Sequence, residues 1–355
     1  MKDNLRLNVQ LLRRRVPNLT TAAKSVGLRP ATVSNLCTGK TSVGKAEVKT
    51  IVTLAKLAEC SLDELIIQQK EIKLVETGIK VIDLFAPLVH GGTIGLVGRS
   101  GTGQISLVAE LCHRLRLKKY KVIFWKPEIE DARLDCIMDK VNIICNTFTE
   151  VHDYMSSSDL NDEFLLVADK TVVVSGDLYK LNKLIDAERS SDMTTVLLDV
   201  LGEAIDEEAP YGPLDTLLKF DIILSKRGLY PSIDPVYSIS TLLEGDVVKN
   251  DHLRIQQRAR KLLRRYRELS ILLNFQGADM LTEVDKVIYR RGERIEAFLS
   301  QPQYVVEGVT GKIGEWVSLS DTLNNVKAIL DGVYDTIEVD QLRYVGKLSK
   351  GKSNL

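Results

Sequence analysis

Hydrophobic and polar positions divide the chain into three stretches with different periodicities. Up to about residue 69, apolar residues recur at helical spacing in short segments, which predicts helices at about 4–15, 19–26, 30–39, 46–58 and 62–67. From about 70 to 250, short apolar runs alternate with helical patterns, which predicts an α/β fold with a mostly parallel sheet. From 251 the pattern is helical again. We therefore expect three domains, residues 1–69, 70–250 and 251–355.

The apolar runs of the central stretch predict its strands. These runs are Thr93–Val97, Val122–Trp125, Phe164–Val167, Thr171–Val174, Thr195–Leu198 and Ile222–Leu224. Ligands of such sheets bind at the carboxyl ends of the strands. The residues that directly follow these runs are therefore the candidates for chemistry.

A glycine-rich turn follows the first predicted strand and has the form of a phosphate-binding P-loop. Gly98 and Gly103 have the P-loop spacing, Gly101 lies between them, and a helical pattern begins at Gln104. Backbone N–H groups at the start of such a helix form a phosphate cradle that needs only glycines and a helix. The alternative is a structural glycine turn that binds nothing.

Two side chains that P-loop chemistry normally uses are replaced in this loop. Gln104 stands at the lysine position and carries no charge, and Ile105 stands at the Ser/Thr position and has no hydroxyl for magnesium. Ser106 lies one residue later, about 100° around the helix, and is not expected to replace that hydroxyl. Arg99 is the cation nearest to the loop in the sequence. ATP or ADP is an expected ligand, whereas magnesium and phosphoryl transfer are doubtful.

Several separated sequence motifs resemble those of the catalytic (beta) subunit of rotary ATP synthases. They occur in the order of that family between about Glu71 and Gly346, and the first, GIKVIDLFAPLVHGG, is followed by IGLVGRSGTG. The later motifs are RGLYPSIDP (227–235), GADMLTEVDK (277–286), FLSQP (298–302), TGKIGEWVSL (310–319) and GVYD (332–335). The resemblance implies a RecA-like P-loop domain followed by a helical domain. The family's N-terminal β-barrel is replaced here by helices.

The resemblance also implies roles for individual residues. Asp199 ends the run VLLD and matches the Walker B aspartate, which holds magnesium directly or through water. Tyr230 matches the adenine-stacking tyrosine, whereas the family's two further pocket aromatics fall on Gln303 and Val309. The alternatives are an acidic residue ending a buried strand and an aromatic residue of the core. The family's catalytic Glu does not align, and Glu128 and Glu130 are better explained as solvated loop acids.

The N-terminal stretch resembles a helix-turn-helix domain of the Cro/repressor class. A short helix, a turn at Gly27 and a helix opening at Pro30 follow each other as in that motif. Its second helix implies contacts to base edges or phosphates from Arg29, Thr32, Ser34 and Asn35. Residues 1–70 contain twelve Lys or Arg and five Asp or Glu, so they carry +7 while the remainder carries −7. We expect DNA as a partner, and the alternative is a helical docking domain with a solvated basic surface.

Composition excludes several other classes of protein. No apolar run approaches the roughly 20 residues of a membrane span, and the N-terminus lacks the apolar core of a signal peptide. The five cysteines are odd in number and scattered, which argues against a disulfide framework or a zinc site. These features predict a cytoplasmic protein.

Three functions are consistent with the sequence. The first is a DNA-binding regulator whose ATP synthase beta-like body binds nucleotide or mediates assembly without hydrolysis. The second is a divergent ATPase that takes its missing cation from Arg99 or from a neighbouring subunit. The third is an assembly subunit that resembles the non-catalytic members of the ATP synthase ring. Expected protein partners are further copies of this chain or a ring-type subunit.

Overall fold

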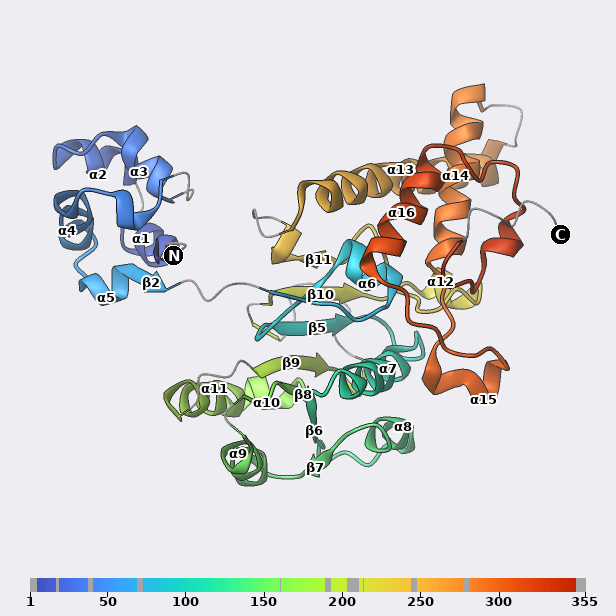
Figure 1. The fold of residues 1–355 in the computed structure, drawn as a ribbon, viewed down its shortest axis with the longest axis horizontal. Helices are drawn as coiled ribbons and strands as arrows, with labels where there is room; N and C mark the ends of the chain where they lie inside the picture. The colour runs from blue at the N-terminus through green and yellow to red at the C-terminus, as the bar shows by residue number, and fades with distance from the viewer. Residues whose placement is uncertain are drawn as a thin grey trace. The chain divides into compact units, whose positions relative to one another are not determined.

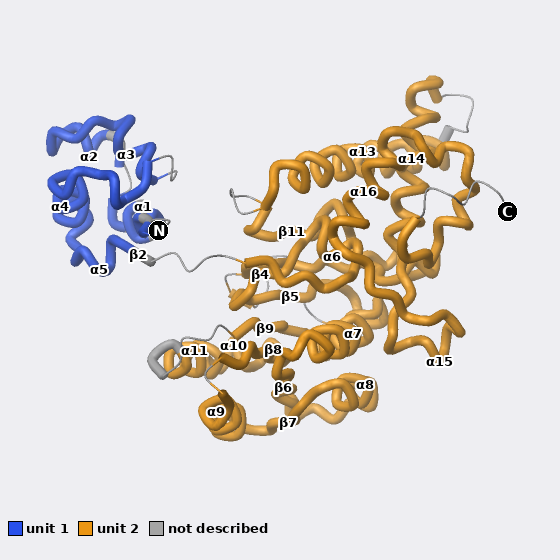
Figure 2. The backbone as a smooth tube through the Cα atoms, in the orientation of Figure 1, with its two compact units in different colours: residues 1–72 blue, residues 73–355 orange. Residues whose placement is uncertain are grey.

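The computed structural model describes residues 5–16, 19–37, 41–68, 73–159, 161–188, 193–202, 211–212, 214–243, 248–276 and 281–348. The chain forms two compact units, residues 1–72 and 73–355 (Figure 2). Each unit has hydrophobic clusters of its own. The predicted boundary after residue 69 lies outside the described residues, and the predicted division after residue 250 lies within the second unit.

The smaller unit consists of short helices and one antiparallel pair of strands (Figure 1). Strand β1 (Leu5–Leu7) pairs with β2 (Ile66–Gln68), so the two ends of the unit lie side by side. The helices are α1 (Val9–Arg15), α2 (Leu19–Ser25), α3 (Pro30–Cys37), α4 (Val48–Leu57) and α5 (Leu62–Leu65), with a 3-10 turn η1 (Val43–Lys45). Their apolar faces meet in one core, formed among others by Leu12, Val33, Leu36, Leu54 and Leu65.

Two predicted helices of this unit are shorter than expected because each gives way to a strand. The side chain of Asn8 accepts a hydrogen bond from the N–H of Leu11 and caps α1, so the preceding residues are extended rather than helical. At the other end, α5 ends at Leu65 and the chain continues as β2. Ser61 and Glu64 form a capping box at the start of α5, with both reciprocal hydrogen bonds present.

The larger unit is built on a seven-stranded sheet with the order β11-β10-β5-β9-β8-β6-β7. All neighbouring strands are parallel except β10 and β11, which confirms the mostly parallel α/β sheet. The strands are β5 (Thr93–Val97), β6 (Lys121–Trp125), β7 (Ile143–Cys145), β8 (Phe164–Asp169), β9 (Met193–Leu198), β10 (Thr216–Lys219) and β11 (Ile239–Ser240). A separate antiparallel pair, β3 (Leu74–Val75) and β4 (Leu88–Val89), precedes this sheet.

Both faces of the sheet are covered, which explains why its strands are almost continuously apolar. Alternate strand residues such as Ile94 and Leu165 enter the cluster formed with α6 (Lys80–Phe85), α7 (Gln104–Leu117), α13 (Asn250–Gln276), α14 (Glu283–Leu299) and α16 (Leu319–Leu330). Their neighbours, such as Leu166 and Leu197, enter a second cluster with α9 (Phe148–Ser157) and α11 (Asp177–Glu188).

Two of the predicted strands are helices in the structure. Thr171–Val174 forms α10, and Ile222–Lys226 forms α12. In both cases an aspartate accepts a backbone N–H at the start of the helix, from Thr171 to Asp169 at 3.0 Å and from Ile223 to Asp221 at 2.6 Å. A short apolar run has no periodicity that distinguishes strand from helix, so these aspartates are the deciding signal. The sequence prediction also missed β7 and β10.

The helical pattern expected from 251 begins with α13, which buries Ile255, Leu263 and Leu269. Several arginines of α13 bind other parts of the larger unit, and Arg260 donates to the backbone oxygens of Phe85 and Ser238. The remaining helical segments are α8 (Asp135–Met138), α15 (Glu307–Thr310), η2 (Ala132–Leu134), η3 (Thr241–Leu243), η5 (Tyr304–Val306) and η6 (Val339–Leu342). Across the described ranges, every helix is too short or too polar to cross a membrane.

Candidate functional site

The glycine-rich turn joins the carboxyl end of β5 to α7, as a P-loop does. Gly101 and Gly103 have φ values of 82° and 91°, a left-handed conformation that favours glycine. Gly98 is required for a different reason, because a Cβ added there would lie 2.7 Å from the Cβ of Phe220. In the sheet, β5 lies between β9 and β10, so the loop opens beside the carboxyl end of β9.

A cleft of about 350 Å³ lies against this loop. This volume is at the small end of the range for ligand pockets. The cleft brings together four of the predicted site residues, Gly101, Gly103, Gln104 and Asp199. The other lining residues are Ser100, Ile105, Ser106, Arg133, Cys136 and Val200.

Gln104 is turned back onto the loop. Its side-chain amide donates a hydrogen bond to the carbonyl oxygen of Gly98 at 2.9 Å, and the residue is buried. Ile105 packs against the hydrophobic cluster on the α7 side of the sheet. The two replaced side chains thus stabilise the loop itself, and they contribute no positive charge and no metal ligand to the cleft.

Asp199 follows β9 and is paired with a lysine that the sequence did not single out. The Nζ of Lys170 lies 3.1 Å from Oδ1 of Asp199, and the two side chains are 14% and 1% exposed. Lys170 follows β8, the strand next to β9. The contact of Lys170 with Asp199 depends on this strand order, which no local pattern near the P-loop reveals.

Arg133 is a second cation that sequence reasoning missed. It lies in η2 after β6, donates from Nη1 to Oγ of Ser100 at 2.9 Å, and donates from Nη2 to the backbone oxygen of Val200 at 3.2 Å. It also forms an ion pair with Asp131, and the hydrogen bonds that the Arg133 side chain and backbone donate to this carboxylate lower the pKa of Asp131. Arg133 therefore links the P-loop to the segment after β9 across the cleft.

Burial also affects the groups around the cleft. Burial raises the pKa of Tyr211, and the negative charges of Asp199 and Asp169 raise it further. The Tyr211 hydroxyl accordingly remains a donor and binds the carbonyl oxygen of Leu96 at 2.7 Å. Burial likewise raises the pKa of the Cys136 thiol, so this cysteine is not an activated thiolate.

The residues at this cleft do not fit a magnesium ion. The predicted metal ligand Asp199 has a lysine ammonium as its counter-ion, and the hydroxyl position is occupied by Ile105. The nearby Asp169 uses its two oxygens to accept backbone N–H groups of Thr171 and Val200. Among the described residues, no group of three or more His, Cys, Asp or Glu could hold a metal ion.

Other predicted residues lie outside the cleft. Arg99, the cation expected near the phosphate, lines a different cleft of about 310 Å³ together with Lys219, Asp221 and Arg267. Glu128 and Glu130 are exposed and do not belong to the lining of the P-loop cleft. Within the described part of the chain, Arg133 lines the P-loop cleft instead, and Lys170 pairs with Asp199 of its lining.

Tyr230 lies beside the P-loop, although it does not line the cleft. A Cβ added to Gly103 would lie 3.6 Å from its ring, and the residue is 36% exposed. Its hydroxyl lies 3.1 Å from Oγ of Ser225. Gln303 is buried and Val309 is 89% exposed, so these two positions do not complete an aromatic pocket.

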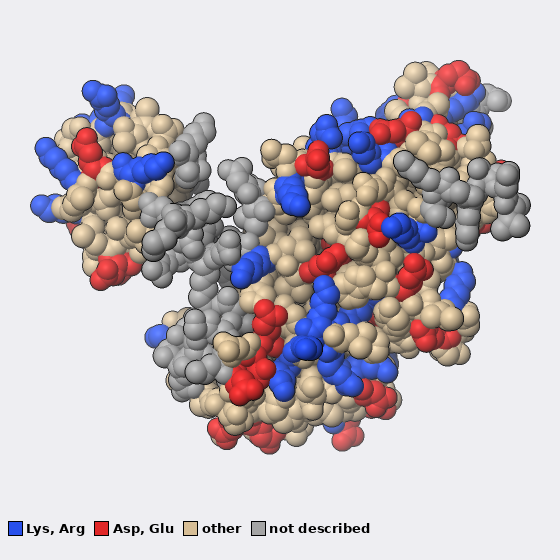
Figure 3. All heavy atoms as spheres, in the orientation of Figure 1, with Lys and Arg blue, Asp and Glu red and all other residues tan. Residues whose placement is uncertain are grey.

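In the smaller unit, the four residues predicted to contact DNA lie on one helix or directly before it. Arg29, Thr32, Ser34 and Asn35 are all exposed, whereas Val33 and Leu36 are buried. Lys and Arg side chains are visible at several places on the face of this unit in Figure 3. The outer side of α3 is therefore accessible to a large ligand.

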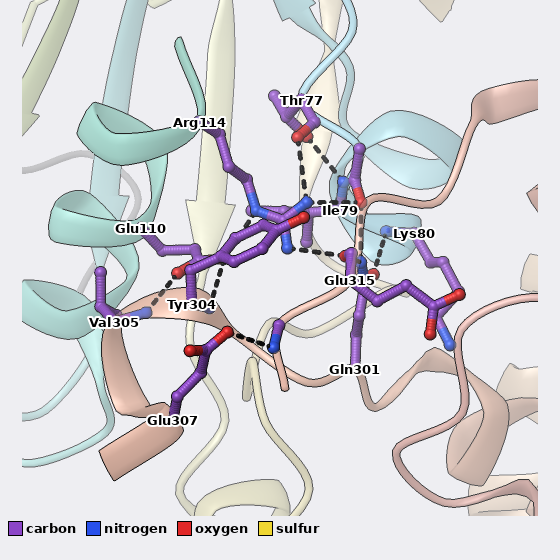
Figure 4. A network of polar contacts seen from close by, with 12 residues as sticks. Thr77, Ile79, Lys80, Glu110, Arg114, Gln301, Tyr304, Val305, Glu307 and Glu315 are labelled. Atoms are coloured by element: carbon purple, nitrogen blue, oxygen red, sulfur yellow. Dashed lines mark hydrogen bonds and ion pairs between the residues drawn. The ribbon is translucent and has the colours of Figure 1, made fainter. Parts of the chain in front are cut away.

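The P-loop helix α7 is tied to the C-terminal segment by a buried polar network (Figure 4). Glu110 and Arg114 form a fully buried ion pair at 2.6 Å. The carboxylate of Glu110 accepts the backbone N–H groups of Tyr304 and Val305 at 3.1 and 3.0 Å. Arg114 donates to the carbonyl oxygens of Gly78 and Glu315, both at 2.9 Å.

The larger unit is similar to ATP synthase subunits in part of its sequence and in its fold. Residues 243–338 match the family model described as the C-terminal domain of V and A type ATP synthase. The chain is also similar in structure to a unique ATP synthase subunit, NeqB, from Nanoarcheaum equitans. The two share 18% identity with a TM-score of 0.56, over 73% of this chain and 76% of NeqB, so this likeness concerns the fold.

Proposed function

We propose that the larger unit acts as an ATP synthase-like subunit that binds nucleotide phosphate without hydrolysing it and works through assembly with other subunits. The observation that carries the proposal is the ion pair that Lys170 forms with Asp199, a residue that lines the P-loop cleft. The likeness to an ATP synthase subunit and the match of the C-terminal domain support the assembly role.

Phosphoryl transfer depends on cations placed where charge develops on the transferred group. Here Gln104 replaces the P-loop lysine and binds Gly98, and Asp199 is neutralised by Lys170. The backbone cradle remains, because its glycines and the N-terminus of α7 are in place. This combination favours binding over hydrolysis.

A phosphate-release assay with ATP and magnesium tests the absence of hydrolysis. We expect the intact chain and its Asp199→Ala variant to release phosphate at the same background rate. Magnesium-dependent hydrolysis that Asp199→Ala abolishes would instead establish the divergent ATPase. Calorimetric titration with ADP on the same samples tests whether the cleft binds nucleotide at all.

Light scattering after size exclusion tests the assembly role. We expect particles larger than one chain, either from this protein alone or after mixing with a ring-type ATP synthase subunit. A monomer at all concentrations that also fails to bind such a subunit would contradict the role.

The exposed outer side of α3 favours DNA binding as a second candidate function for the smaller unit. Arg29, Thr32, Ser34 and Asn35 are accessible there, and residues 1–70 carry a charge of +7. Fluorescence anisotropy with a labelled duplex should show binding that weakens steeply as salt rises. Arg29→Ala should weaken it, whereas Lys56→Ala on α4 serves as the control at an exposed cation of another helix. Absence of binding at low salt by the folded chain would exclude this function.

A further inference from the structure

We infer that Lys170 takes the place of a divalent cation at the P-loop cleft, so that a phosphate-bearing ligand binds there without metal. The inference rests on the nucleotide binding proposed above and specifies its chemistry. It follows from which charged groups the fold places beside Asp199.

Lys170 and Asp199 form a close and shielded pair. Their charged atoms are 3.1 Å apart, and the side chains are 14% and 1% exposed. A metal ion bound to Asp199 would lie next to the ammonium group, and screening by water is weak at such a shielded position. The lysine therefore both neutralises the aspartate and opposes a divalent cation.

The backbone holds this pair in place. The N–H of Lys170 donates to the carbonyl oxygen of Leu198 at 2.8 Å, directly before Asp199. Asp169, the residue before Lys170, is in register with Leu198, and its carboxylate accepts the N–H of Val200 at 3.1 Å. Hydrogen bonds on both sides of the pair thus join the end of β8 to the end of β9. The lysine is part of the sheet edge and not a mobile surface side chain.

The remaining groups of the cleft suit a free phosphate anion. The loop and the first turn of α7 provide backbone donors at the N-terminus of a fourteen-residue helix, and Arg133 also lines the cleft. Because Lys170 compensates Asp199, the charge of this aspartate needs no bound metal before phosphate enters. The ligand class is therefore a nucleoside diphosphate or triphosphate in its metal-free form.

Calorimetric titration of the intact protein with ADP, in EDTA and in excess magnesium chloride, tests the inference. We expect the wild-type affinity to be equal or higher in EDTA. In Lys170→Met the uncompensated Asp199 should weaken metal-free ADP binding about tenfold or more, and magnesium should restore it. Lys170→Arg keeps the charge and should keep the wild-type behaviour.

A matched control separates this effect from the loss of any lysine. Lys180 forms an exposed ion pair with Asp177 at 2.9 Å on α11, and Lys180→Met should bind ADP like the wild type in both buffers. Circular dichroism checks that each variant is folded. The gain of magnesium dependence in Lys170→Met is a readout that mere destabilisation would not produce.

The titrations distinguish a failure of the role of Lys170 from a failure of nucleotide binding. Wild-type binding that requires magnesium, or Lys170→Met binding that is as indifferent to magnesium as the wild type, would overturn the role of Lys170 and leave nucleotide binding intact. No ADP binding in either buffer would overturn the nucleotide binding itself, and this inference with it. The assembly role is measured separately and would stand.

Discussion

At the scale of the residue, the most demanding feature of the larger unit is the ion pair of Glu110 and Arg114. Both side chains are fully buried, and a buried charge is tolerated only when its charge and hydrogen bonds are satisfied. Here the carboxylate also accepts two backbone N–H groups, and the guanidinium group also donates to backbone carbonyls. Each partner thus compensates the buried charge of the other.

Removal of one partner should therefore be costly. Arg114→Met is expected to lower the free energy of unfolding by about 3–5 kcal/mol, because it leaves the buried Glu110 carboxylate without its counter-ion. Urea denaturation followed by tryptophan fluorescence measures the loss. Arg254→Met breaks an exposed ion pair with Asp251 and should cost at most about 1 kcal/mol. Equal losses in the two variants would contradict the structural role of the buried pair.

Some residues at the cleft could be identified from the sequence, and others could not. Gly101, Gly103 and Gln104 could be placed from the sequence because they belong to one glycine-rich loop, and Asp199 because it ends an apolar strand. Lys170 and Arg133 could not, because their positions follow from the neighbourhood of β8 and β9 and from the fold of η2 over the loop. Long-range pairing of this kind leaves no local pattern.

At the scale of the element, α13 joins the sheet to the C-terminal helices. It packs in one cluster with α6, α14 and α16. Near its start, the ring Nε2 of His252 lies 3.0 Å from the carbonyl oxygen of Leu84 at α6, and the residue is 3% exposed. Burial lowers the pKa of His252 below its usual value of 6.5, so the folded protein holds the neutral imidazole.

This histidine should make stability depend on pH. Below about pH 6.5 the unfolded chain binds a proton that the folded chain does not, so stability is lost as pH falls through this value. His252→Gln should unfold at a lower temperature at neutral pH but lose less stability between pH 7.5 and 5.5, roughly one unit on either side of that pKa. Thermal denaturation at both pH values measures the difference. An unchanged pH dependence in the variant would show that other groups cause it.

Elements with a clear period were predicted better than short apolar runs. The long pattern of α13 and the strands β5, β6, β8 and β9 were recognised, because their length or their position between helical patterns identifies them. Thr171–Val174 and Ile222–Leu224 were assigned to strands, although Asp169 and Asp221 accept backbone N–H groups at the starts of these helices. Both aspartates were present in the sequence, but the short apolar runs after them were given more weight.

At the scale of the whole molecule, the two units have independent cores. Residues 73–355 contain two hydrophobic clusters, and the smaller unit contains its own. We expect residues 73–355 to fold alone with the thermal transition of the larger unit in the intact chain, because its described core uses no side chain of the smaller unit. Calorimetry of both proteins provides the comparison. A transition lowered by more than a few degrees would reveal stabilisation by the smaller unit.

The hydrogen bonds of Lys80 and Gln301 join the P-loop half of the larger unit to its C-terminal helical half. The match to the ATP synthase C-terminal domain begins at residue 243, which suggests a piece that could be exchanged between proteins. Yet the ammonium group of Lys80 donates to the carbonyl oxygens of Ser300 and Val345 at 3.0 and 2.6 Å, and Gln301 binds Gly78 at 2.7 Å. A transplanted C-terminal domain would leave a buried lysine and several backbone groups without partners. The P-loop half and the helical half therefore depend on each other for their buried hydrogen bonds, and a functional exchange between proteins would have to move both.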